Sequence, residues 1–315
     1  MKKTFRKAML IALASSMIIS SGIISMADET SGSAQTAVTE TSAATENSTG
    51  AQTTEAQELA SDPVLNAQED QRVVDFYKDS VIIGDSVADG FNKYALKRSA
   101  NPLLANLKFF TQARYSIHDE IQPIGTEGVN HLWYGGAQHY APELVALSGA
   151  RHVYLSLGLN DVKMRPSEVL ANYKSLIESI AAANPAVDIT IISTTYIYPD
   201  AQTKLSGIKS WAFDNDTVRK LNTSMQELAA EKGYGYIDIA NRLADANGNL
   251  DPKYCTDKYI HQNADAYVVW VQCLREYAAS KNYAHANDET VIEENAASTS
   301  ETTSGTVAET AAATA

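Results

Sequence analysis

Short apolar runs alternate with longer segments of helical periodicity through the middle of the chain. The apolar runs are rich in Val, Ile and Leu, as expected of strands that are buried on both faces. The segments between them place apolar residues three and four positions apart, as amphipathic helices do. The predicted strands are residues 81–84, 152–161, 187–197 and 235–240, with 107–116 as a further candidate, and the predicted helices are residues 167–183, 217–232 and 264–280.

This alternation predicts an α/β fold with a mostly parallel central sheet and helices on both of its faces. Residues 62–283 are enough for one sizeable core, so one domain is expected there. In folds of this kind the ligand site lies at the carboxyl ends of the strands. The strand ends are therefore the places where functional residues should be found.

Both ends of the chain differ in composition from this middle part. Residues 1–27 combine basic residues, an apolar stretch and a small-residue cleavage site at Ser25-Met26-Ala27, which predicts a secretory signal peptide, with a membrane anchor as the alternative. Residues 28–61 and 284–315 are dominated by Thr, Ser, Ala and Glu, which predicts disordered segments. We expect a secreted, extracellular protein without an integral membrane segment after processing. Its tails would be spacers on a cell surface or simply solubilising segments.

The charge of the predicted domain is only mildly acidic. The whole chain has a formal net charge of −13, and setting aside the signal's four basic residues and the tails' twelve acidic residues leaves −5 for residues 62–283. An acidic surface argues against nucleic acid or an anionic membrane as the main partner. It permits a neutral glycan or a small ester.

The cysteines and histidines do not form a recognisable metal motif. Cys255 and Cys273 are the two cysteines of the chain, and in a secreted protein they either pair in a disulfide or remain buried thiols. Two cysteines cannot form a structural zinc site alone. No metal-ligand spacing such as HExxH occurs among the other histidines, which include His118, His131, His139 and His152.

Polar clusters occur at three places: after two of the predicted strands and before the last predicted helix. Gly84-Asp85-Ser86 ends the first strand, Gly158-Leu159-Asn160-Asp161 ends the second, and residues 255–267 precede the last helix. A nucleophilic Ser86 would need a base, for which His261 is a candidate, and an oxyanion donor. The amide of Asn160 is a suitable donor, and Asp257 could hold the imidazole in the required tautomer. Read singly, each cluster is also compatible with turn or helix-cap chemistry.

Taken together and in this order, these motifs resemble those of the SGNH (GDSL-type) hydrolases, over residues 77–280. The resemblance implies a three-layer α/β/α, flavodoxin-like fold. It also implies that Ser86 is the nucleophile of an acyl-enzyme mechanism and His261 its general base. The oxyanion would be held by the backbone N–H of Ser86, the Asn160 side chain and one further backbone N–H. Members of the family need no metal or organic cofactor.

Two positions depart from the family pattern. Asp257 precedes His261 by four residues instead of three, but one helical turn brings i and i+4 to one face as readily as i and i+3. Asp257 is therefore expected to orient His261, with a Ser-His dyad as the alternative. The glycine that supplies the third oxyanion donor has no clear counterpart. Ser116 stands at the expected place and Gly135 and Gly136 follow later; we favour Ser116, because any non-proline residue offers an N–H.

The expected activity is that of a secreted serine esterase acting on a small acyl ester, an O-acetyl group on a polysaccharide in particular. No long apolar lid that would shelter a fatty acyl chain is visible in the sequence. A lysophospholipase or aryl-esterase of the same fold is the enzymatic alternative, and a catalytically idle glycan-binding module is the other. The aromatic segment 131–140 would be a sugar-stacking surface or the packed core of a long loop. The sequence carries no signal for an oligomeric state.

Overall fold

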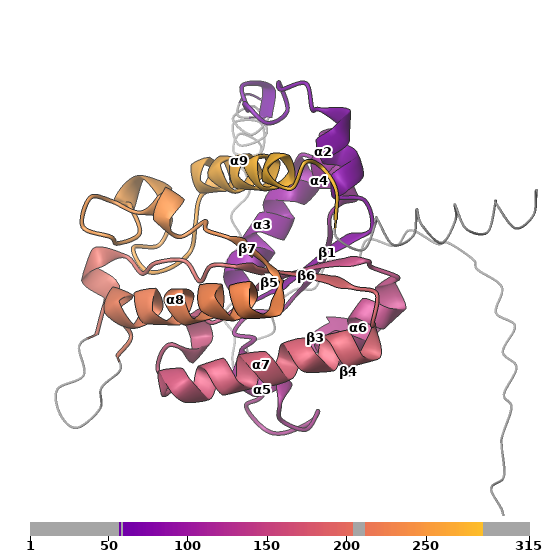
Figure 1. Ribbon diagram of the computed structural model, residues 1–315. Coiled ribbons are helices and arrows are strands. Elements are labelled where there is room, and N and C mark those ends of the chain that lie inside the picture. Colours follow the sequence, from indigo (N-terminus) through magenta and orange to yellow (C-terminus); the bar gives the residue numbers. More distant parts are fainter. Residues whose placement is uncertain (1–56, 58, 204–211, 286–315) are drawn as a thin grey trace, which may run out of the picture. The chain divides into compact units, whose positions relative to one another are not determined.

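Five strands form one parallel sheet at the centre of the fold (Figure 1). Their order is β2-β1-β5-β6-β7, and every neighbouring pair is parallel. The strands are β1 (Ser80–Gly84), β2 (Lys108–Thr111), β5 (His152–Ser156), β6 (Asp188–Ile192) and β7 (Gly235–Ile237). The predicted mostly parallel sheet is confirmed, and its order is that of flavodoxin-like folds.

The computed structural model describes residue 57 and residues 59–203 and 212–285. The predicted signal peptide (1–27) and most of the two predicted tails (28–61 and 284–315) lie outside the described residues. His285, which the sequence assigns to the tail, is buried and contacts Phe76 and Asp188. The folded part therefore extends at least to residue 285.

Helices cover the sheet on both faces and complete the three predicted layers (Figure 1). One face is covered by α2 (Gln71–Phe76), α3 (Ser86–Lys97), α4 (Pro102–Asn106) and α9 (Ala264–Ser280). The other face is covered by α5 (Ile117–Glu120), α6 (Ala141–Ser148), α7 (Pro166–Ala183) and α8 (Asn215–Lys232).

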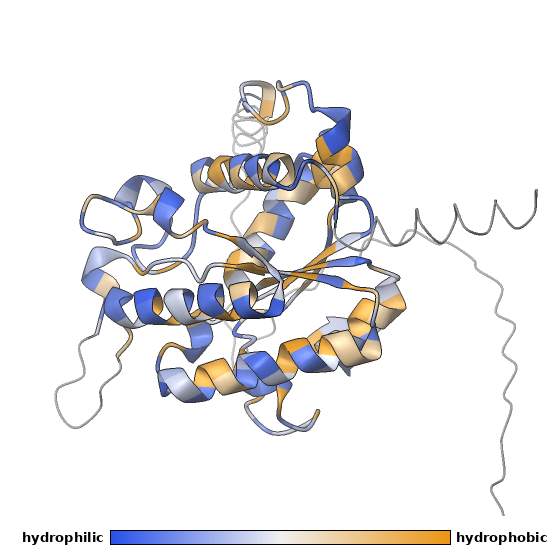
Figure 2. Ribbon diagram, viewed as in Figure 1, coloured by the Kyte–Doolittle hydropathy of each residue, from blue (hydrophilic) through white to orange (hydrophobic). Residues whose placement is uncertain are grey.

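Two apolar cores result from this layering, one on each side of the sheet. Ile82 packs into the core beneath α3 and α9, whereas its neighbours Val81 and Ile83 pack into the core beneath α6, α7 and α8. All five residues of β1 and of β5 are buried, which explains why the three central residues of each strand are apolar on both faces of the sheet. Figure 2 shows apolar residues gathered along the strands, and polar and apolar residues alternating along the long helices.

The three predicted helices are confirmed to within two residues. Helix α9 has the predicted bounds, and the side chain of Asn263 caps its start by accepting the N–H of Ala266 at 3.1 Å. Helix α8 begins earlier than predicted because Asp214 caps it, accepting the N–H of Thr217 at 2.8 Å. Among the described helices, none is long and apolar enough to cross a membrane.

The segment 131–140, interpreted from sequence as a loop, contains a β-hairpin. Strands β3 (Leu132–Tyr134) and β4 (Ala137–His139) pair antiparallel across Gly135 and Gly136. Both glycines have positive φ (60° and 84°), a conformation that tight hairpin turns require. Leu132 is buried, but Trp133 and Tyr134 are 57% and 52% exposed, so the alternative of core packing is wrong for these two rings.

The remaining connections are short 3-10 turns and loops. The turns are η1 (Leu159–Asp161), η2 (Pro199–Ala201), η3 (Asn241–Leu243) and η4 (Pro252–Tyr254). Turn η1 directly follows β5, and the loop after η4 leads into α9. Since all five strands run in one direction, these segments gather at the same edge of the sheet as the residues that follow β1.

Candidate active site

Ser86 is the first residue of α3 and lies where the central strand β1 ends. The side chain of Asp85 caps this helix by accepting the N–H of Val87 at 2.9 Å. Gly84, the last residue of β1, does not have a backbone in the left-handed region, so no tight turn requires a glycine there. Its role is steric instead, because a Cβ atom there would lie 2.4 Å from the Ala88 Cβ and 2.8 Å from the Ser156 carbonyl oxygen.

Ser86, His261 and Asp257 form a hydrogen-bonded chain. The Nε2 atom of His261 lies 3.1 Å from the Ser86 Oγ, and its Nδ1 atom lies 2.5 Å from the Asp257 Oδ2. With the Nδ1 proton directed at a carboxylate, Nε2 is left as the acceptor for the Ser86 hydroxyl proton. The three side chains thus have the connectivity of a serine hydrolase triad.

Asp257 reaches His261 through a loop and not through the helical turn expected from the sequence. An antiparallel bridge between Cys255 and Gln262 closes the loop. The Asp257 Oδ1 accepts the backbone N–H groups of Tyr259, Ile260 and His261 at 2.8, 3.1 and 3.2 Å. Asp257 can therefore contact His261 across a spacing of four residues, because its carboxylate accepts the backbone N–H groups of the intervening loop.

The environment of Asp257 stabilises its ionised form. Partial burial alone would raise the pKa of this carboxyl, but the hydrogen bonds from the His261 side chain and from the backbone of Tyr259 and His261 outweigh burial and lower the pKa. The carboxylate is thus available to stabilise an imidazolium on His261.

Helix α9 holds the His261 loop against the start of α3. The Tyr267 hydroxyl donates to the Val87 carbonyl at 3.2 Å, and the Trp270 Nε1 donates to the Gln262 Oε1 at 2.7 Å. Both rings are buried. The first bond joins α9 to α3, and the second holds Gln262, the residue that directly follows His261.

Asn160 lies in η1, directly beyond β5. Its Nδ2 atom donates to the Tyr115 carbonyl at 3.0 Å and to the Asp85 Oδ2 at 3.2 Å. Both amide protons thus have acceptors within the protein.

Ser116 precedes α5 and caps it, its Oγ accepting the Asp119 N–H at 2.9 Å. Within the part of the chain that the structure describes, the backbone N–H groups of Ser86 and Ser116 donate to no protein acceptor. Both residues line the same cleft as Asn160 and His261. Gly135 and Gly136, the other candidates for the third donor, lie in the β3–β4 turn and do not line this cleft.

Asp161, the last residue of the polar cluster after β5, has a structural role that the sequence does not indicate. Its carboxylate is buried and accepts the backbone N–H groups of Ile117 and His118, both at 3.0 Å. It thereby ties the segment that carries Ser116 to the turn that carries Asn160. Burial raises the pKa of Asp161 to about 6 and that of Asp85 to about 7.

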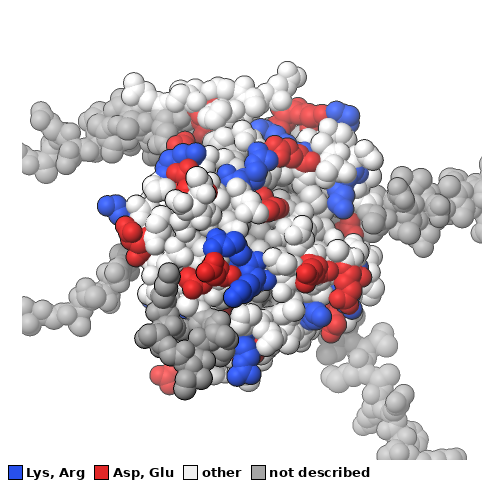
Figure 3. Space-filling model, turned by 60° about the vertical axis from the view of Figure 1, so that its left-hand side comes forward, with Lys and Arg blue, Asp and Glu red and all other residues white. Residues whose placement is uncertain are grey.

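The cleft around Ser86 has a volume of about 580 Å³ and is open to solvent. Its described lining contains both polar and apolar side chains: Ser86, Ala113, Arg114, Ser116, Asp119, Gly128, Asn130, Leu159, Asn160, Lys163, Phe213, Tyr259, Ile260 and His261. On the face drawn in Figure 3, basic and acidic side chains lie interspersed.

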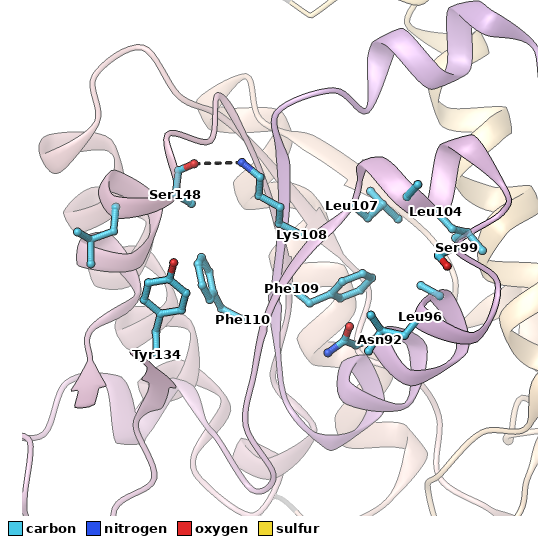
Figure 4. A pocket seen from close by; sticks show the side chains of 13 residues that line it. Asn92, Leu96, Ser99, Leu104, Leu107, Lys108, Phe109, Phe110, Tyr134 and Ser148 are labelled. Carbon is cyan, nitrogen blue, oxygen red and sulfur yellow. Dashed lines mark hydrogen bonds between the residues drawn. The ribbon is translucent and has the colours of Figure 1, made fainter. Parts of the chain in front are cut away.

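A second groove, of about 540 Å³, follows the edge strand β2 (Figure 4). Phe109 and Phe110 project from opposite sides of this strand, Phe110 toward Tyr134, and the Lys108 Nζ donates to the Ser148 carbonyl at 3.1 Å. None of the predicted catalytic or oxyanion-hole residues lines this groove, although Tyr134 of the candidate sugar-stacking segment does.

The cysteines are free thiols, so the disulfide alternative is wrong. Cys273 is buried, and Cys255 donates to the Asp257 Oδ1 at 3.5 Å.

His152, Asp188 and His285 each offer a possible metal-ligating atom, and these atoms lie within 4.8 Å of one another at the amino ends of β5 and β6. The His285 ring stacks on the His152 ring, with their centroids 3.5 Å apart. Its two nitrogens form hydrogen bonds with the Asp188 carboxylate and the Phe76 carbonyl. Stacked parallel rings cannot direct their in-plane lone pairs at one ion, so this cluster, as arranged here, is a hydrogen-bonded one. It lies at the opposite edge of the sheet from Ser86.

A model of the GDSL-like lipase/acylhydrolase family matches residues 82–269. The chain belongs to this family, the resemblance to SGNH hydrolases is confirmed, and the protein is an enzyme that hydrolyses ester bonds. Among curated proteins, none matches the sequence.

Solved structures that match the chain include a GDSL-like lipase from Bacteroides thetaiotaomicron, at 13% identity and a TM-score of 0.48, covering 73% of this chain and 97% of that one. A member of the lipolytic G-D-S-L family from Veillonella parvula has 19% identity and a TM-score of 0.43, covering 64% and 96%. The lipase/acylhydrolase from Enterococcus faecalis has 12% identity and a TM-score of 0.42, again covering 64% and 96%.

Proposed function

We propose that this protein is a secreted serine esterase that removes a small acyl group, an O-acetyl group in particular, from a carbohydrate. The observation that carries the proposal is the hydrogen-bonded chain from Ser86 through His261 to Asp257 at the wall of an open cleft. A hydroxyl that is bonded to an oriented imidazole is the nucleophile of acyl transfer.

In the first half of the reaction, the Ser86 Oγ attacks the ester carbonyl carbon and its proton passes to the His261 Nε2. The resulting tetrahedral oxyanion accepts hydrogen bonds from the backbone N–H groups of Ser86 and Ser116 and from the Asn160 amide. The bond to the alcohol oxygen then breaks, and the same Nε2 proton passes to that oxygen. The alcohol leaves and an acyl-Ser86 ester remains.

In the second half, water attacks the acyl-Ser86 carbonyl and gives a proton to the His261 Nε2. The bond to the Ser86 Oγ breaks, the proton returns to Oγ, and a carboxylic acid is released. Asp257 stays ionised throughout, in keeping with its lowered pKa, and stabilises each imidazolium.

The cleft favours a small, polar substrate. Charged and amide side chains line it together with aromatic ones, a combination that suits a sugar ring better than a long acyl chain. Secretion is inferred from residues 1–27, whose composition is that of a signal peptide.

A longer acyl group is the main competing substrate class within the family. Leu159, Phe213, Tyr259 and Ile260 give the cleft an apolar wall, which favours a lysophospholipase or aryl-esterase activity. Faster release of decanoate than of acetate from matched 4-nitrophenyl esters would select this alternative.

The test of the proposal is hydrolysis of 4-nitrophenyl acetate by the full secreted chain beside Ser86→Ala and His261→Ala. Both variants should lose about 10³-fold or more in kcat while keeping the parent's melting temperature within a few degrees. Equal rates in all three proteins would refute the mechanism. Glycan binding without turnover, unchanged in Ser86→Ala, would then favour the idle glycan-binding module.

A further inference from the structure

The strand order divides the cleft around Ser86 into two walls. Because Ser86 follows β1, the segment that follows β2 lies on one side of it, and the segments that follow β5, β6 and β7 lie on the other. The first wall consists of Ala113, Arg114, Ser116, Asp119, Gly128 and Asn130. The second consists of Leu159, Asn160, Lys163, Phe213, Tyr259, Ile260 and His261. The first wall is mainly polar, whereas the second carries the large apolar and aromatic side chains of the cleft beside the polar Asn160, Lys163 and His261.

Asp119 is the most unusual member of the polar wall. It is only 8% exposed, yet among the described residues its carboxylate makes no hydrogen bond and no ion pair. It stands in the first turn of α5, where an acidic side chain often bonds back to the N-cap N–H, but that bond to Ser116 is not made. A largely buried carboxylate without a donor is costly, so its natural partner is a donor on a molecule in the cleft.

Arg114, which is exposed, and Asn130, which is half-buried, extend this polar surface. Neither side chain has a protein partner within the described part of the chain. Arg114 also has a φ of 64°, which is uncommon for a residue other than glycine. Residues held in such conformations gather at ligand sites, where the surrounding structure maintains them. Together the three side chains offer acceptors on Asp119, donors on Arg114 and both on Asn130.

The opposite wall presents one accessible aromatic ring, that of Tyr259, which is 38% exposed. Phe213 is only 5% exposed, and the Lys163 Nζ lies 4.9 Å from its ring centroid. The Phe213 and Tyr259 centroids are 5.4 Å apart with an interplanar angle of 31°, and Tyr259 is two residues from His261. Ring carbons of a sugar can pack on such a surface while its hydroxyls face polar groups. The two walls therefore complement the two kinds of surface that a sugar ring carries.

We propose that Arg114, Asp119 and Asn130 form a hydroxyl-binding subsite that selects a sugar as the carrier of the ester. This inference rests on the proposed function, since it assigns the substrate body that Ser86 acts upon. Asp119 accepts hydrogen bonds from sugar hydroxyls, and Arg114 and Asn130 donate to their oxygens. The subsite contributes to binding, while the chemistry of ester cleavage stays with Ser86 and His261.

The test compares acetate esters that share the reacting group but differ in the alcohol. The substrates are mono-O-acetyl methyl glycosides of glucose, galactose and xylose, with cyclohexyl acetate as a ring without hydroxyls and 4-nitrophenyl acetate as a general ester. The variants are Asp119→Asn, Arg114→Gln and Asn130→Ala. Glu168→Gln, which changes an exposed acid in the first turn of α7 away from the cleft, is the matched control.

The parent enzyme should prefer its best sugar acetate over cyclohexyl acetate by about ten-fold or more in kcat/KM. Each subsite variant should lose about ten-fold or more on that sugar, mainly through KM, while cyclohexyl acetate and 4-nitrophenyl acetate change by less than about two-fold. Absence of a sugar preference in the parent, or equal losses on all substrates, would overturn the subsite. Absence of Ser86-dependent turnover on every ester would instead overturn the proposed function.

Discussion

The Asp257 carboxylate lies 2.5 Å from the Nδ1 atom of His261, and both residues belong to one short loop. The other carboxylate oxygen accepts three backbone N–H groups of that loop. Asp257 therefore has two effects that reinforce each other: it fixes the backbone that carries the imidazole and it fixes the imidazole itself. A dyad without Asp257 would lack both.

Replacing Asp257 by Asn should lower kcat by about 10²–10⁴-fold, because an amide cannot hold the Nδ1–H tautomer or stabilise the imidazolium. The loss should be measured as kcat and kcat/KM on 4-nitrophenyl acetate from pH 5 to pH 9. Asp251→Asn, which changes an acid that caps η4 outside the cleft, is the control and should retain the parent's rate. A parent-like rate for Asp257→Asn would leave Ser86 and His261 acting as a dyad.

Asn160→Ala should lower kcat by about 10²–10³-fold with a small change in KM, because an oxyanion donor acts mainly in the transition state. Ser116→Ala keeps its backbone N–H and should lose much less, under about ten-fold in kcat. It should instead lose about 1 kcal/mol in unfolding free energy, since the Ser116 hydroxyl caps α5. Steady-state kinetics and urea unfolding on both variants separate the two effects. The reverse ranking in kcat would show that the Ser116 side chain, and not its backbone, contributes to catalysis.

Gly84→Ala should destabilise the fold by about 2–3 kcal/mol, because the added methyl group would overlap Ala88 and the Ser156 carbonyl. The unfolding free energy from urea titration is the measurement. Gly149→Ala is the control: it also adds a methyl group, but into open space at a φ of 66°, and should cost about 1 kcal/mol through the backbone alone. A loss at Gly84 no larger than that at Gly149 would contradict the steric role.

Asp161 should make the stability of the fold depend on pH. Burial raises its pKa from 3.8 to about 6 in the folded chain, so the native state holds this proton more tightly than the unfolded state does. The associated stability is present below about pH 4 and is lost as the pH rises through 6, by an amount on the order of 3 kcal/mol. The parent should therefore lose stability relative to Asp161→Asn between pH 4.5 and pH 8 in urea titrations. A gap between the two proteins that does not change with pH would contradict this.

The sheet and the long helices could be predicted because their signals are local. Strands β1 and β5 each have three consecutive apolar residues at their centres, and α9 begins at an Asn cap and keeps its helical period to the end. The β3–β4 hairpin was missed because its strands are three residues long and two of its aromatic residues are exposed. The Gly-Gly pair at residues 135 and 136 was the signal that could have revealed it.

In the site, the residues at strand ends could be predicted, because a parallel sheet gathers its carboxyl ends at one edge. The hydrogen bonds from the backbone N–H groups of Ile117 and His118 to Asp161 could not be predicted, since these residues are 44 and 43 positions away from it in the sequence. The loop that lets Asp257 reach His261 depends on the Cys255–Gln262 bridge, which no local pattern indicates. The polar wall of Arg114, Asp119 and Asn130 likewise becomes visible only when the segments after β2 fold back beside Ser86.

The proposed mechanism requires that Ser86 carries the acyl group during turnover. Its most direct test is the intact mass of the chain, followed by peptide mapping, after treatment with a fluorophosphonate that reacts only with activated serines. We predict one adduct, on Ser86, which forms in parallel with loss of 4-nitrophenyl acetate hydrolysis and is absent from His261→Ala. An adduct on another residue, or full activity in a chain labelled at Ser86, would contradict this mechanism.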